Sequence, residues 1–124
     1  MNIVDSCGWL EFFADGPNAS FFAPIIQDTT NLIVPSISIT EVFRRILQQK
    51  DEDAAIQAIA LMHQGRIVDL TPSIAISAAQ LGVQHHLPLA DSIIYSTAKY
   101  YKAVIYTQDA DFKNLSNVHF IEKT

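Results

Sequence analysis

The chain has 124 residues, of which 49% are hydrophobic and 17% are charged. This composition is typical of a folded globular protein, and we expect one domain over residues 1–124. The single cysteine, Cys7, excludes a disulfide framework. The formal net charge of −5 argues against a general nucleic-acid coat protein without excluding a local nucleic-acid site. No leader segment or apolar run long enough to cross a bilayer is visible, so we expect a soluble cytoplasmic protein without a membrane partner.

Short apolar segments alternate with segments of helical periodicity along the chain. Asp5-Ser6 and Pro72 are helix-start signals, whereas Gly16-Pro17 and Gly65 end helices. In chain order we predict a strand at 2–4, a helix between Asp5 and Gly16, a helix at 18–27, a strand at 31–34, a helix from Ser38, a helix at 51–64, a strand at 66–70, a helix from Pro72, a helix at 89–101, a strand at 103–106, a helical turn at 109–114 and a strand at 118–121.

Helices between successive strands indicate β-α-β crossovers. We therefore expect an α/β fold, a three-layer α/β/α sandwich around a mostly parallel sheet of about five strands. The pattern alone does not give the order of the strands.

Four acidic residues are predicted at the same edge of this sheet. Asp5 directly follows the first strand, and Asp109 lies just beyond the strand at 103–106. Glu41 and Asp91 lie near the starts of helices that begin at that edge. Ligands of open parallel sheets bind at the carboxyl ends of the strands, so we expect these carboxylates to converge on a site.

Each acid also has a purely structural interpretation. Asp5 and Asp109 are acceptable helix caps, Ser38 and Glu41 have the spacing of a capping box, and Asp91 suits a helix amino terminus. Together, however, two such charges about 5 Å apart repel by roughly 3 kcal/mol at an effective dielectric constant of 20. A hard divalent cation, Mg²⁺ or in its place Mn²⁺, would neutralise them.

Four segments carry a resemblance to a known family. Ile3–Ser6, Pro35–Val42, Leu87–Ser92 and Tyr106–Phe112 resemble, in the same order, the acidic blocks of the PIN domain, and most closely those of VapC-type toxins from toxin–antitoxin pairs. The resemblance implies a parallel α/β/α sandwich and a Mg²⁺-dependent endoribonuclease that cleaves RNA by attack of water, leaving a 5′-phosphate and a 3′-hydroxyl. It also implies a cognate antitoxin as partner and a homodimer.

The resemblance assigns roles residue by residue. Catalytic and metal-binding roles fall on Asp5, Glu41, Asp91 and Asp109, and supporting roles fall on Asp111, Thr107 and Ser6. Cys7 departs from the family, since many relatives have a second Ser or Thr there.

Other residues have two interpretations each. Arg44 and Arg45 are either solvated cations on a helix or contacts to RNA phosphates. Trp9, Phe12 and Phe13 have the spacing of a buried helix face, and core packing or a protein-binding groove is favoured over base stacking. Cys7 is expected to be a small buried side chain.

Three other functions remain as alternatives. A PIN-fold RNA- or protein-binding module with little turnover would keep the same acids. A phospho-acceptor receiver domain is disfavoured, because Asp5 stands alone and Thr107-Gln108-Asp109 contains no lysine. Dinucleotide binding is disfavoured because no glycine-rich loop follows a strand.

Overall fold

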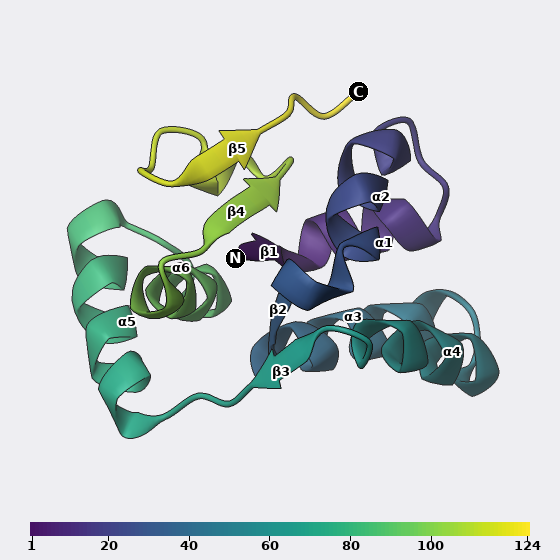
Figure 1. The fold of residues 1–124 in the computed structure, drawn as a ribbon, viewed down its shortest axis with the longest axis horizontal. Helices are drawn as coiled ribbons and strands as arrows, with labels where there is room; N and C mark the ends of the chain where they lie inside the picture. Colours follow the sequence, from purple (N-terminus) through teal and green to yellow (C-terminus); the bar gives the residue numbers. More distant parts are fainter.

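A computed structural model describes all residues from Met1 to Thr124, with five strands and six helices (Figure 1). Strands β1 (Asn2–Val4), β4 (Val104–Thr107) and β5 (Val118–Phe120) form one sheet in the order β1-β4-β5. Strands β2 (Ile33–Pro35) and β3 (Arg66–Val68) form a second pair, and a bridge between Asn2 and Leu32 joins it to β1. Every pairing is parallel, which confirms the predicted parallel α/β fold.

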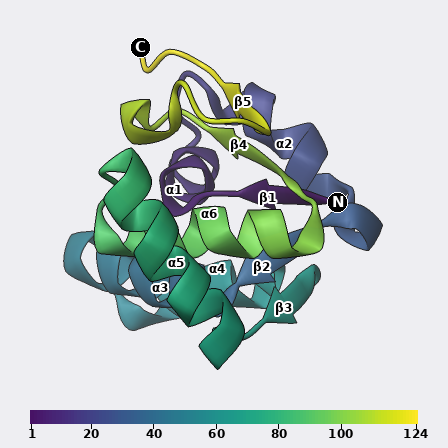
Figure 2. The same cartoon turned by 90° about the vertical axis from the view of Figure 1, so that its left-hand side faces the viewer.

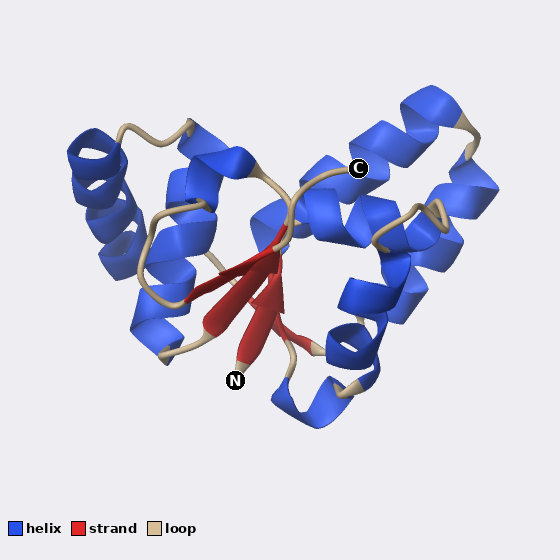
Figure 3. Cartoon of the chain, turned by 90° about the horizontal axis from the view of Figure 1, so that it is seen from above, coloured by secondary structure: helices blue, strands red, loops and turns tan.

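Helices cover both sides of the strands (Figures 2 and 3). One side holds α1 (Ser6–Phe13), α2 (Ala19–Gln27), α3 (Ser36–Gln49) and α4 (Glu52–Met62). The other side holds α5 (Pro72–His85) and α6 (Leu89–Tyr101). Short 3₁₀ turns at Thr29–Asn31 and Ala110–Phe112 complete the chain. None of these helices is both long enough and apolar enough to cross a membrane.

Successive residues of a strand enter different cores, because side chains alternate between the faces of a sheet. In β1, Val4 packs with Trp9 and Phe22 on the side of α1 to α4, whereas Ile3 packs with Tyr95 on the side of α6. Each of these five side chains is at most 1% exposed. The predicted middle layer of the sandwich is therefore a sheet buried on both faces. Of the aromatic residues of α1, Trp9 is in the core, and Phe12 and Phe13 are partly buried against it.

The start of α3 differs from the prediction. The helix begins at Ser36 with Pro35 as its N-cap, two residues before the predicted capping serine. Ser38 is fully buried and its hydroxyl has no hydrogen-bond partner. Glu41 is therefore beyond the first turn and instead accepts a hydrogen bond from Ser6, so the predicted capping box is wrong.

Gly8 sets how closely α1 approaches its neighbours. A Cβ atom at this position would lie 2.7 Å from both Phe22 Cε1 and Val4 Cγ1. Only a residue without a side chain fits there. This close packing fixes the first turn of α1, and with it the position of Asp5.

Candidate metal centre at the carboxyl edge of the sheet

Asp5 lies at the point where β1 passes into α1. Its backbone N–H donates to the carbonyl of Tyr106 at 3.3 Å, which ties it to the adjacent strand β4. Its side chain is the N-cap of α1, with Oδ1 accepting from the Gly8 N–H at 2.9 Å. Oδ2 accepts from the Thr107 hydroxyl at 2.7 Å. The residue is only 2% exposed, so both oxygens are held in place inside the protein.

Thr107, the last residue of β4, connects two of the acids. While its hydroxyl donates to Asp5, the same oxygen accepts from the backbone N–H of Asp109 at 2.9 Å. Asp109 in turn caps the following 3₁₀ turn, accepting from the Asp111 N–H at 2.9 Å. The parallel register, in which Val4 pairs with Tyr106, brings the carboxyl ends of β1 and β4 side by side and makes this connection possible.

Two helices supply the remaining acids. Glu41 on α3 accepts a 2.6 Å hydrogen bond from the hydroxyl of Ser6. Asp91 lies in the first turn of α6 and makes no side-chain hydrogen bond to the protein. A pocket of about 290 Å³ brings these groups together, lined by Asp5, Ser6, Cys7, Leu10, Glu41, Arg45, Asp91 and Asp109.

The electrostatics of this pocket oppose the ionised carboxylates. Burial raises the pKa of Asp5 to about 7, although hydrogen bonds from Thr107 and Gly8 lower it, and the charges of Asp109 and Glu41 raise it further. Burial also raises the pKa of Asp91 to about 7, and the charges of Asp109, Asp111, Asp5 and Glu41 add to the effect. The four acids are thus close enough for their negative charges to repel one another, and no cation pairs with them.

The donor set fits a hard divalent cation. Carboxylate oxygens of Asp91, Asp109 and Asp111 all lie within 4.8 Å of one another. The only ion pair in the chain, Lys113–Glu122, involves none of them, and Arg45 lines the pocket without pairing with any carboxylate. Oxygen ligands of this kind are those that Mg²⁺ and Mn²⁺ prefer.

Most of the residues expected at the site lie together. Asp5, Ser6, Glu41, Arg45, Asp91 and Asp109 all line the pocket, and Thr107 lies behind it. Asp111, expected as a supporting residue, belongs to the tightest group of carboxylates, whereas Asp5 and Glu41 lie outside that group. Arg44 is exposed and does not line the pocket.

Two pocket residues, Leu10 and Cys7, were not predicted to belong to the site. Leu10 lies one turn after Ser6 on α1, and this helical spacing was the available signal. Cys7 is half-buried rather than buried, and burial raises the pKa of its thiol. Its sulfur accepts a hydrogen bond from Gln108 Nε2 at 3.6 Å, a contact that no local sequence pattern predicts.

Together these observations define the class of the protein. It is a parallel α/β protein with a carboxylate pocket at the carboxyl edge of its sheet. A profile of the PIN domain matches residues 3–118, so the chain belongs to the PIN domain family. No curated protein sequence matches the chain.

Solved structures of toxins share this fold. A toxin–antitoxin complex from Klebsiella pneumoniae superposes with a TM-score of 0.82 at 20% identity, covering 99% of this chain and 100% of that one. VapC20 from Mycobacterium tuberculosis, described as a sarcin–ricin loop cleaving toxin, gives 0.78 at 14% identity over 95% and 97% of the two chains. VapBC2 from Rickettsia felis, bound to a DNA fragment from its promoter, gives 0.75 at 14% identity over 98% and 97%. The fold is therefore that of VapC toxins.

Proposed function

We propose that this PIN-domain protein is a Mg²⁺-dependent endoribonuclease that hydrolyses RNA phosphodiester bonds, and that it is the toxin of a toxin–antitoxin pair. One observation carries the proposal: acids from four separate segments line a single pocket that contains no paired cation. The likeness in fold to VapC20, a toxin described as cleaving the sarcin–ricin loop, supports RNA as the substrate. We propose that this activity is cytoplasmic.

The acids in and beside the pocket have different roles in metal binding. Asp91, Asp109 and Asp111 would hold Mg²⁺, or Mn²⁺ in its place, with Asp5 beside them. When bound, the ion neutralises phosphate charge and lowers the pKa of a coordinated water. Thr107 holds both acids in position, because its hydroxyl donates to Asp5 and accepts from the backbone N–H of Asp109.

Glu41 has a separate role in this proposal. Ser6 fixes one of its oxygens at 2.6 Å, and its other oxygen accepts no hydrogen bond from the protein. That free oxygen orients the attacking water and accepts its proton. Hydrolysis by water in this way leaves a 5′-phosphate and a 3′-hydroxyl.

Incubation of the purified protein with total cellular RNA tests the proposal. With Mg²⁺ we expect discrete cleavage products carrying a 5′-phosphate, and with EDTA we expect none. Asp91→Asn should abolish cleavage, because it removes one of the three closest carboxylates. Asp69→Asn, an exposed acid outside the pocket, should cleave normally.

The outcomes separate the two functions that the fold allows. Cleavage by Asp91→Asn would refute the site assignment. RNA binding without cleavage by the wild-type protein would instead indicate a PIN-fold binding module.

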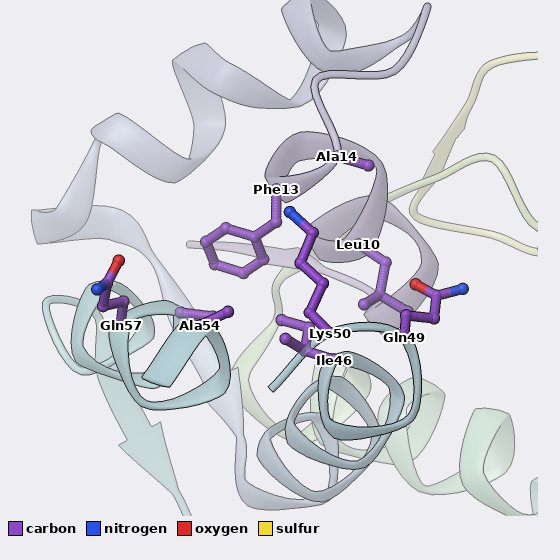
Figure 4. Close-up of a pocket in the computed structure, with 9 residues that line it drawn as sticks. Leu10, Phe13, Ala14, Ile46, Gln49, Lys50, Ala54 and Gln57 are labelled. Carbon is purple, nitrogen blue, oxygen red and sulfur yellow. The ribbon is translucent and has the colours of Figure 1, made fainter. Parts of the chain in front are cut away.

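A groove next to the acidic pocket is the proposed binding site of the antitoxin. This groove, of about 350 Å³, lies between α1, α3 and α4 (Figure 4). Figure 4 shows Leu10 and Phe13 of α1 facing Ile46 and Ala54, and Leu10 also lines the acidic pocket. An apolar helix of the antitoxin in this groove would reach the pocket. The likeness to toxin–antitoxin complexes supports this partner, and Ala54→Arg should block co-purification with it.

The outer face of α5 supports a homodimer. The helix, from Pro72 to His85, contains no Asp, Glu, Lys or Arg. Ile76 and Val83, two turns apart on the same face, are 65% and 80% exposed. An apolar and uncharged helix face of this kind suits a second copy of the chain. Ile76→Glu should yield monomers in light scattering, whereas Ile56→Glu on α4 should not.

A further inference from the structure

The chain after β5 is held against the carboxyl edge of the sheet. The Ile121 N–H donates to the carbonyl of Thr107 at 3.0 Å, and the Glu122 carbonyl accepts from Asn18 Nδ2 at 3.0 Å. Figure 3 shows the C-terminus beyond the ends of the strands, between the two groups of helices. The two residues before Lys123 therefore have fixed backbone positions near the acidic pocket.

Asn18 connects this tail to the wall of the pocket. It is 7% exposed, and its amide also donates to Gln108 Oε1 at 2.9 Å. Gln108 in turn donates to the sulfur of Cys7, which lines the acidic pocket. Both donors of the Asn18 amide are thus occupied, one by the tail and one by the residue between Thr107 and Asp109. A chain of side-chain hydrogen bonds links the pocket to the tail.

Lys123 carries its charge close to this wall. Its backbone directly follows Glu122, whose carbonyl is held by Asn18, so its side chain starts at the same edge of the sheet as Thr107. Lys123 is exposed and makes no ion pair. Arg45, on the α3 side of the pocket, is likewise exposed and unpaired. Arg45 thus lines the pocket and Lys123 follows a segment anchored beside it, and neither cation pairs with an acid.

Arg44 is exposed beside Arg45 on α3, and Lys50 lines the groove between α1, α3 and α4. Four further basic side chains are engaged elsewhere or lie at the opposite edge of the sheet. Lys113 pairs with Glu122, and Arg66 and Lys99 lie over tyrosine rings. Lys102 ends α6 at the amino ends of the strands, just before β4 begins. Lys123 is the one basic residue after β5, and it makes no ion pair.

On the basis of the proposed nuclease function, we propose that Lys123 binds an RNA phosphate next to the acidic pocket and that Asn18 positions it by anchoring the tail. An RNA strand must bring a phosphate into a pocket whose acids repel it. Cations beside the pocket attract the neighbouring phosphates, which fixes the strand without neutralising the metal ligands. Arg45 then binds the strand from α3 and Lys123 from the tail.

A binding experiment with charge-matched variants tests this role. In an Asp91→Asn background, which we expect not to cleave, a labelled mixed-sequence single-stranded RNA is titrated with Mg²⁺ at several KCl concentrations. Lys123→Gln should weaken binding about fivefold at low salt and reduce the slope of log K against log [salt] by roughly 0.7, the value for one phosphate contact to a single strand. Lys102→Gln removes the same charge at the opposite edge and should change neither quantity.

Two further variants distinguish a contact from a structural effect. Lys123→Arg should restore binding, because it keeps the charge. Asn18→Ser removes both amide donors and should weaken binding as Lys123→Gln does, with no additional loss when the two are combined. In the cleaving protein, Lys123→Gln should raise KM and leave kcat unchanged.

The possible failures are distinguishable. Equal binding by Lys123→Gln and Lys102→Gln, while the wild type cleaves RNA, would overturn the role of Lys123 alone. If the wild-type protein neither bound nor cleaved RNA, the nuclease function would be refuted, and this inference with it.

Discussion

Asp91→Asn should stabilise the metal-free protein at alkaline pH while abolishing its activity. Asp91 accepts no hydrogen bond that the substitution would break, and it faces the charges of Asp109, Asp111, Asp5 and Glu41. Its pKa is raised from 3.8 to about 7 in the folded state, chiefly by burial. Between these pH values the folded chain holds a proton that the unfolded chain releases. The stability that Asp91 contributes is therefore fully present below pH 4 and is lost as the pH rises through 7.

The expected gain in stability of Asp91→Asn can be calculated from the shift in the pKa of Asp91. A difference of three pKa units corresponds to about 4 kcal/mol. Because Asp91 is partly exposed, solvent screening reduces this to roughly 1–2 kcal/mol. For a chain of this length, that is a rise in Tm on the order of 4–8 °C.

Thermal unfolding in EDTA measures this rise. At pH 8 the Tm of Asp91→Asn should exceed that of the wild type by the stated amount, and near pH 4 the two should agree. Asp69→Asn, exposed and outside the pocket, should not change Tm at either pH. Mg²⁺ should stabilise the wild type at pH 8 and have little effect on Asp91→Asn. An Asp91→Asn protein no more stable than wild type at pH 8 would show that burial and the neighbouring acids do not oppose the charge of Asp91.

Three further predictions concern neighbouring residues and pH. Thr107→Val removes the hydroxyl that donates to Asp5 and accepts from Asp109, so it should cost about 2 kcal/mol of unfolding free energy in urea and reduce cleavage at least tenfold. Gly8→Ala places a methyl group 2.7 Å from Phe22 Cε1 and should destabilise the protein by about 1–3 kcal/mol in the same assay, whereas Ala79→Gly on the exposed face of α5 should cost no more than about 1 kcal/mol. At low Mg²⁺, kcat/KM should rise with pH through 7, because Asp5 and Asp91 must lose protons to bind the ion, and the midpoint should move to lower pH as Mg²⁺ increases. A midpoint independent of Mg²⁺ would contradict the last prediction.

The convergence of the acids could be predicted because it depends on local order. Asp5 follows β1 directly, and Asp109 follows β4 by two residues. In a parallel sheet both positions lie at the carboxyl edge, whatever the order of the strands. The hydrogen bonds of Thr107 to Asp5 and Asp109 could not be predicted, because they require β1 and β4 to be neighbours. The order of the strands depends on how helices pack on both faces of the sheet, which the local pattern does not contain.

The capping box failed for a physical reason that the local pattern does not contain. Ser38 and Glu41 have the right spacing, but Pro35 ends β2 and the helix begins at Ser36. Glu41 is then too far along α3 to reach the N-cap, and a hydroxyl thirty-five residues earlier, that of Ser6, becomes its partner. The contacts of Asn18 with Gln108 and Glu122 are longer still in sequence, and they depend on the closed fold.

Asp5 can cap α1 and bind a metal ion at the same time, so its structural and proposed functional roles are compatible. As an N-cap it needs one acceptor for the Gly8 N–H, which serine or asparagine would supply without a buried charge. Its second oxygen accepts from Thr107, whose hydroxyl could rotate to serve another acceptor. Neither contact requires a negative charge on Asp5. Burial and the nearby acids disfavour that charge, and the pKa of Asp5 is raised to about 7. In the proposed function a bound divalent cation would reverse that cost, so metal binding would explain the charge of Asp5, which the two hydrogen bonds do not require.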